Sequence, residues 1–190
     1  MRAMILVATL LACASNAAQA QSKPNERKGF WVGFGLGGGS FGIECDICTD
    51  DRVNGGTGYV RLGGTLSRHL LLGVEVNAWV NPSDAVDESI GNGSVVLLWY
   101  PSATGALYLK FGLGGMTYSG DDGVDVLTAT APTFSIGLGY EFRVGRNISL
   151  VPYMNTFGSS EVDVEINGVS FGNVPLTLNV FELGLGLTWH

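Results

Sequence analysis

Residues 134–144 read Phe-Ser-Ile-Gly-Leu-Gly-Tyr-Glu-Phe-Arg-Val, with apolar side chains at every second position. Alternation with a period of two places those side chains on one face of a β-strand. The opposite face carries Gly137 and Gly139 together with the charged residues Glu141 and Arg143. This stretch therefore predicts a strand that has one purely apolar face and one face of glycines and charges.

The same alternation recurs along the chain in segments of about ten residues. Eight strands are predicted, over about 30–37, 59–63, 70–80, 94–100, 107–114, 134–144, 148–157 and 181–190. The fourth is the weakest, because both of its faces are apolar. Connections after the second, fourth and sixth strands are short, and the others are long and polar. This arrangement is typical of an up-and-down barrel with tight turns at one end and loops at the other.

The charged residues indicate which face of the strands points into the barrel. A water-soluble barrel of the lipocalin kind would turn its charges outward, where the glycines on the same face would serve no purpose. In a crowded interior the glycines make room, and the apolar face then meets lipid. Three bases balance three acids on this face, as an interior ion-pair network requires: Arg61, Lys110 and Arg143 with Glu75, Glu141 and Glu182. The predicted fold is all-β, an eight-stranded antiparallel up-and-down transmembrane β-barrel.

Composition supports spanning by strands. Hydrophobic residues make up 46% of the 190 residues and charged residues only 14%. No run approaches the roughly 18 consecutive apolar residues that a membrane helix needs. The 29 glycines are dispersed along the chain, which disfavours helices further.

The first twenty residues have the features of a secretory signal. Arg2 is followed by a short apolar stretch and by Ala18-Gln19-Ala20, a small-x-small cleavage site. We therefore expect a signal peptide at 1–20, a periplasmic N-terminal segment at 21–28 and the barrel at 29–190. A lipoprotein signal with Cys13 as the acylated residue is the alternative.

Cys45 and Cys48 remain after the leader is removed. In an oxidising compartment such a pair is expected to form a small loop disulfide. A redox role or a metal site are the alternatives. The first would need a βαβ setting and the second would need further ligands, and the sequence indicates neither.

Acidic residues concentrate in the long loops. Thirteen of the 17 acids lie there, against one base, Arg52. Such a rim repels nucleic acid, so no nucleic-acid partner is expected, and it could hold Ca²⁺ or Mg²⁺ weakly. An acidic run is more often a solvated surface than a site.

The final strand resembles the C-terminal signal by which outer-membrane barrels are recognised for assembly. That pattern is carried by Glu182, Gly184, Leu187 and Trp189, and His190 departs from it by following the aromatic residue. With the Tyr100-Pro101 turn and the strand at 107–114, the chain resembles an outer-membrane β-barrel domain protein, similar in plan to the small A- and X-type barrels. The resemblance implies the bacterial outer membrane as location, and membrane lipid and the barrel-assembly machinery as partners. It does not imply an activity.

Catalytic motifs are weak. Gly33-x-Gly35-x-x-Gly38 matches a dinucleotide-binding spacing, but no helix is predicted after it. A histidine-based, lipid A-modifying barrel would need that residue at the outer rim, whereas His69 and His190 fall at the predicted periplasmic end. An active site based on aspartates is the alternative, with candidates in the rim loops at Asp84, Asp87, Asp121, Asp122 and Asp125.

We therefore expect no catalytic residues, no cofactor and no metal. The predicted function is non-enzymatic, a structural or surface-interaction role through acidic extracellular loops. The 158–177 loop, whose apolar residues alternate, is expected to extend the seventh and eighth strands and to bind an extracellular partner by strand addition. A lipid A-modifying enzyme and a narrow small-solute pore are the alternatives.

Overall fold

The computed structural model describes residues 27–44, 52–81, 87–121, 125–159, 162–167, 169–174 and 176–190. The expected signal peptide at 1–20 and the expected Cys45–Cys48 disulfide lie outside these ranges. No helix among the described residues is long and apolar enough to cross a membrane.

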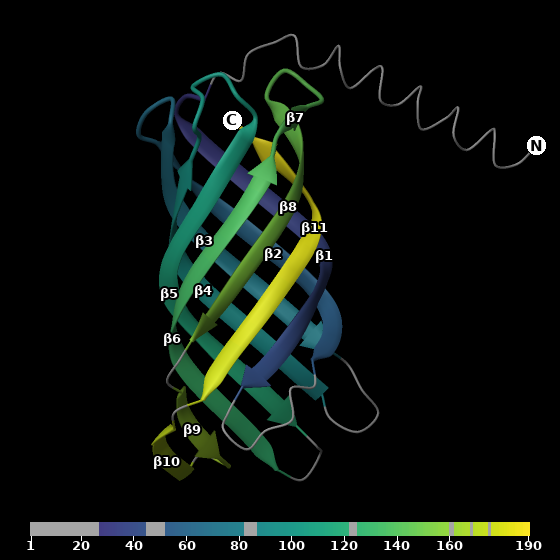
Figure 1. The fold of residues 1–190 in the computed structure, drawn as a ribbon, viewed down its shortest axis with the longest axis vertical. Helices are drawn as coiled ribbons and strands as arrows, with labels where there is room; N and C mark the ends of the chain where they lie inside the picture. Colours follow the sequence, from purple (N-terminus) through teal and green to yellow (C-terminus); the bar gives the residue numbers. More distant parts are fainter. Residues whose placement is uncertain are drawn as a thin grey trace, which may run out of the picture.

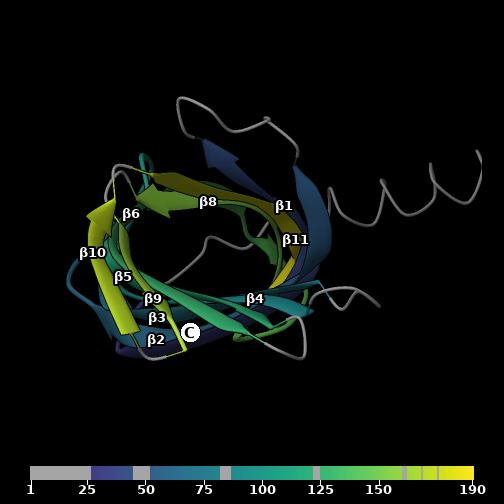
Figure 2. The ribbon, with the colours of Figure 1, turned by 90° about the horizontal axis from the view of Figure 1, so that it is seen from below.

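A closed antiparallel barrel forms the body of the molecule (Figures 1 and 2). In the described part of the chain its wall has eight long strands: β1 (Phe30–Glu44), β2 (Val53–Thr65), β3 (Leu70–Asn81), β4 (Asp87–Trp99), β5 (Leu107–Asp121), β6 (Val126–Tyr140), β8 (Ile148–Ser159) and β11 (Thr177–Trp189). Consecutive wall strands pair with one another, and β1 pairs with β11, so the sheet has closed on itself. The predicted fold class is confirmed.

The two ends of the barrel differ. We call the end that carries the short connections and the C-terminus the turn end; it is uppermost in Figure 1. Strand β7 (Phe142–Arg143) also lies there and pairs with β8. At the opposite end, the loop end, β9 (Val162–Ile166) and β10 (Val169–Val174) form a hairpin.

The hairpin is placed differently from the prediction. It does not extend β8 and β11; β9 instead pairs with β6 over Leu127–Thr130. Strand β8 covers β6 only over Phe134–Gly139, because β8 ends at Ser159 while β6 continues to the loop end. The uncovered backbone of β6 needs hydrogen-bond partners, and β9 supplies them.

Apolar side chains on the outer face form a belt around the wall. Leu36 and Leu113 are 75% and 68% exposed, and similar residues project from the other wall strands. Near the turn end the outward side chains include the aromatic residues Phe30, Trp99 and Trp189. An apolar belt with aromatic residues near its edge is what a membrane-spanning barrel presents to lipid.

The interior is filled by side chains in three zones. An apolar cluster that includes Phe41, Trp79, Met116 and Phe157 fills the loop end. The buried charged residues Arg61, Glu75 and Glu182 lie near the middle of their strands. A second cluster, Trp31, Leu71, Val96, Leu98, Tyr100, Tyr108 and Val151, lies towards the turn end. This second cluster takes Val96 and Leu98 from the inner face of β4, which explains why the alternation is weak in that half of the strand, whereas Asn92 and Ser94 are buried on the same face of its other half.

Interior glycines make room for large aromatic rings. A Cβ atom on Gly35 would lie 2.5 Å from the Tyr59 ring and 2.8 Å from the Tyr153 ring. At Gly184 it would lie 2.6 Å from the Tyr153 hydroxyl oxygen. Distances under 3 Å are not tolerated, so the glycines on the charged face are needed to fit the tyrosines inside the barrel.

Candidate interior charge network and turn-end closure

Three of the six predicted network residues meet in the middle of the barrel. Arg61 on β2 lies opposite Glu75 on β3, and Lys110 reaches them from β5. Lys110 Nζ is 2.5 Å from Glu75 Oε1, and Arg61 Nη1 is 3.9 Å from Glu75 Oε2. All three side chains are at most 1% exposed. A carboxylate buried this completely needs such partners, since an unpaired buried charge costs several kcal/mol, about 3–5 when a partner is removed.

Aromatic rings surround the Arg61 guanidinium. It donates a 2.9 Å hydrogen bond to the Tyr108 hydroxyl oxygen. Its central carbon also lies 4.8 Å from the Tyr59 ring centre and 5.0 Å from that of Tyr108. These are cation–π distances, so the rings stabilise a cation held away from water.

Glu182, the third predicted acid, is buried on β11 without a base in contact in the described part of the chain. Its Oε2 accepts a hydrogen bond from Asn155 at 3.3 Å. Its Oε1 has no hydrogen-bond partner among the described residues. The structure thus buries Glu182 and gives it one neutral hydrogen-bond donor among the described residues, Asn155.

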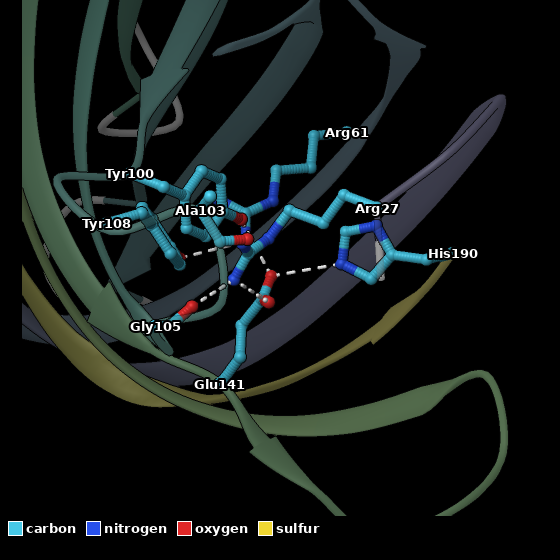
Figure 3. Close-up of polar contacts among 8 residues, drawn as sticks. All are labelled: Arg27, Arg61, Tyr100, Ala103, Gly105, Tyr108, Glu141 and His190. Carbon is cyan, nitrogen blue, oxygen red and sulfur yellow. Dashed lines mark hydrogen bonds and ion pairs between the residues drawn. The ribbon is translucent and has the colours of Figure 1, made fainter. Parts of the chain in front are cut away.

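Glu141 forms a second cluster at the turn end (Figure 3). This residue lies between β6 and β7, and its backbone N–H donates to the carbonyl of Ala106 at 2.9 Å. Its carboxylate accepts a 2.7 Å hydrogen bond from the Tyr100 hydroxyl. His190 Nε2 lies 3.1 Å from Oε1, and Arg27 Nη2 lies 3.2 Å from Oε2. A single buried carboxylate therefore contacts both Arg27, just before β1, and His190, just after β11.

Arg27 is enclosed on several sides. Its guanidinium carbon lies 3.4 Å from the centre of the Tyr100 ring. Nη2 donates to the carbonyl of Gly105 at 2.5 Å, and Nη1 donates to that of Ala103 at 3.4 Å. Arg27 is only 3% exposed. The sequence reasoning missed this residue because it assigned 21–28 to a segment outside the barrel.

Arg143 is placed differently from the prediction. Its side chain is half-buried on β7 and donates to the carbonyl of Arg146 in the next turn. The long alternation of β6 ends at Tyr140, and β7 has only two residues, so Arg143 lies at the mouth of the barrel near water. Among the residues that the structure describes, the buried bases are Arg27, Arg61 and Lys110, and the buried acids are Glu75, Glu141 and Glu182.

The pKa of Glu141 shows that its neighbours at the turn end stabilise the ionised carboxylate. Burial alone would raise the pKa of this carboxyl group. The hydrogen bond and charge of His190, the charge of Arg27 and the Tyr100 hydroxyl outweigh burial and lower that pKa below its ordinary value. The same neighbourhood raises the pKa of Tyr100 well above its ordinary value, through burial first and the Glu141 charge second. Glu141 is therefore ionised, and Tyr100 is a neutral donor.

The two histidines that the sequence analysis considered for catalysis lie together at one end of the barrel. Both histidines lie at the turn end, and His69 Nδ1 is 2.8 Å from the carbonyl oxygen of Tyr100. Within the described ranges, no group of three or more His, Cys, Asp or Glu side chains could hold a metal ion.

The assembly-signal residues all lie on β11. Glu182 points inward, Gly184 leaves space for Tyr153, Leu187 is half-buried, and Trp189 is 54% exposed on the outer face. A role for these four residues in assembly stays a prediction.

Residues 4–189 match the family model of the outer membrane protein beta-barrel domain. The chain belongs to this family. Among solved structures, the barrel is similar to Neisserial surface protein A, at 14% identity and a TM-score of 0.64 over 87% of this chain and 99% of that one. It is also similar to the outer membrane protein OprG from Pseudomonas aeruginosa, at 10% identity and a TM-score of 0.50 over 87% and 98%. No curated protein sequence is significantly similar. At these identities the two structures establish the fold alone.

Proposed function

We propose that this outer-membrane barrel is a non-enzymatic surface protein of the bacterial outer membrane. The barrel is the anchor, held by lipid around the apolar belt. The turn end faces the periplasm and the loop end faces outward, as short turns and long loops do in such barrels. The barrel-assembly machinery is the partner during biogenesis, through the C-terminal strand.

The β9–β10 hairpin is the observation that carries the proposal. It lies at the loop end, and β10 is the last strand of the sheet order, paired with β9 on one side. An edge strand offers backbone donors and acceptors to a partner strand. The acidic residues Asp163 and Glu165 on β9 and Asp125 nearby favour a partner with positive charge.

A deletion tests this role. A variant in which a short Gly-Ser linker replaces residues 160–173 is expected to lose extracellular partner binding while keeping heat-modifiable gel migration. The matched control replaces residues 82–86, in another loop, in the same way and should keep both. Unchanged binding by the first variant would contradict the proposal.

The filled interior argues against the small-solute pore. The apolar cluster fills the loop end with large side chains, and Glu141 with its partners fills the turn end. Water and ions need a continuous polar path, and the apolar cluster at the loop end interrupts it. Single-channel recording in planar bilayers is expected to give no current steps beyond those recorded with protein-free detergent.

The positions of the histidines argue against the lipid A-modifying enzyme. A histidine base for such chemistry would have to lie at the outer rim, whereas both histidines lie at the opposite end. We expect the lipid A of a deletion strain to have the same mass spectrum as that of its parent.

A further inference from the structure

The groups around Arg27 match a planar guanidinium on several sides at once. The Tyr100 ring covers its flat face, the carbonyl oxygens of Ala103 and Gly105 accept from its edge, and the Glu141 carboxylate neutralises its charge (Figure 3). Glu141 and Tyr100 are themselves almost fully buried. An ammonium group lacks the flat face and the fixed fork of donors, so the arrangement favours arginine over lysine.

The backbone before β1 is shaped to deliver this arginine. Gly29 has a φ of +77°, a left-handed conformation that favours glycine. The carbonyl of Gly29 accepts a hydrogen bond from the Thr65 N–H at 2.9 Å. The chain therefore bends sharply at the mouth of the barrel, so that Phe30 begins the wall while the Arg27 side chain reaches inward.

The other end of the chain meets the same carboxylate. Strand β11 ends at Trp189, opposite Val32 of β1, and the next residue is His190, which contacts Glu141. Strands β1 and β11 are the first and last of the wall, and their pairing closes the cylinder. Glu141 thus contacts residues on both sides of this closing seam.

We propose that the turn end is a guanidinium-binding site, occupied by Arg27 of the same chain, that locks the N-terminal segment and the β1–β11 seam after the barrel closes. This inference does not depend on the surface role proposed above. It predicts that the site, once Arg27 is removed, accepts a small alkylguanidinium from solution.

Chemical rescue of an R27A variant tests the site directly. The folded variant in detergent micelles is titrated with ethylguanidinium at millimolar concentrations, and the His190 imidazole signals are followed by NMR. We expect saturable shifts with ethylguanidinium and none with ethylammonium. Wild-type protein, whose site is filled, should show no saturable shift. Shifts that do not saturate, or equal binding to the wild type, would overturn the proposal.

Two further measurements distinguish docking of the N-terminal segment from a change in the stability of the whole barrel. Trypsin cleavage after Lys28 is expected to be about tenfold faster in R27A and in R27K, which corresponds to about 1.4 kcal/mol of lost docking. R146A, which removes an exposed arginine at the same end, is the control and should be cleaved at the wild-type rate. Amide exchange along the β1–β11 seam should rise in R27A and return towards wild type with ethylguanidinium. Wild-type cleavage and exchange rates in R27A would show that Arg27 locks nothing.

Discussion

Three buried carboxylates differ in the partners that offset the free-energy cost of their burial. They are Glu75, Glu141 and Glu182. Two bases contact Glu75, and a base, a histidine and a tyrosine surround Glu141. Glu182 has an amide donor in Asn155. Removing one partner is costly where it leaves a buried charge behind.

Lys110→Met is expected to destabilise the barrel by about 3–5 kcal/mol, because Glu75 would lose its nearest cation. Adding Glu75→Gln should recover part of that loss, since the uncompensated charge is then gone. Urea unfolding followed by tryptophan fluorescence measures both. Arg68→Met, at an exposed turn residue, is the control. Equal stability of the Lys110→Met variant and wild type would show that Lys110 does not stabilise the buried Glu75 carboxylate.

Glu141 should make stability depend on acid. Its pKa in the folded state lies below the ordinary value of 4.5, so its stabilising contribution is present above pH 4.5 and is lost as the pH falls through the folded value. The difference in the urea midpoint of unfolding between wild type and Glu141→Gln should therefore decrease as the pH falls from about 6 to about 3. A difference that stays constant over that range would contradict the assignment.

Strand β6 is the element that joins the barrel to the surface hairpin. It pairs with β8 over Phe134–Gly139 and with β9 over Leu127–Thr130. Pro132 lies between these two stretches, where its missing N–H costs no hydrogen bond to either partner. Val162 then anchors β9 in the apolar cluster.

Val162→Asp is expected to undock the hairpin, because burying an unpaired carboxylate costs several kcal/mol, about 3 or more. The variant should become sensitive to protease near the hairpin while its barrel keeps heat-modifiable migration. Val169→Asp is the matched control, since Val169 lies on β10 and is 61% exposed. If both variants resist protease equally, β9 is not held through Val162.

At the scale of the whole molecule, the barrel exposes apolar side chains and buries charged ones, unlike a water-soluble protein. Its outer face is apolar, and its interior combines two apolar clusters with paired charges, which suits lipid outside and a filled interior. The two ends have different chemistry. The turn end holds Arg27 and His190 against Glu141, and the loop end carries the hairpin with the acidic residues Asp163 and Glu165.

Surface labelling tests the orientation of the whole barrel. In a Cys45→Ser/Cys48→Ser background, Val169→Cys at the loop end should react with a membrane-impermeant maleimide on intact cells. Arg68→Cys at the turn end should react only after the outer membrane is opened. Both sites are exposed in the folded protein, so access alone distinguishes them. Equal labelling of both sites on intact cells would contradict the assigned orientation.

Local alternation was sufficient to predict the fold class, because a period of two and the balance of charges are properties of the residues themselves. The pattern at 134–144 indicates a strand, and the glycines beside Glu141 indicate a crowded inner face. The same reasoning placed Arg61, Glu75 and Lys110 inside.

Tertiary structure alone decided which residues meet. Arg27, which the alternation placed outside the barrel, is the base beside Glu141, because the chain bends at Gly29 before β1 begins, and alternation carries no information about such a bend. Strand β9 pairs with β6 and not with β11, because β8 ends before β6 does and leaves backbone groups to be satisfied. Both outcomes depend on where distant segments end in space, and a local sequence pattern does not encode that.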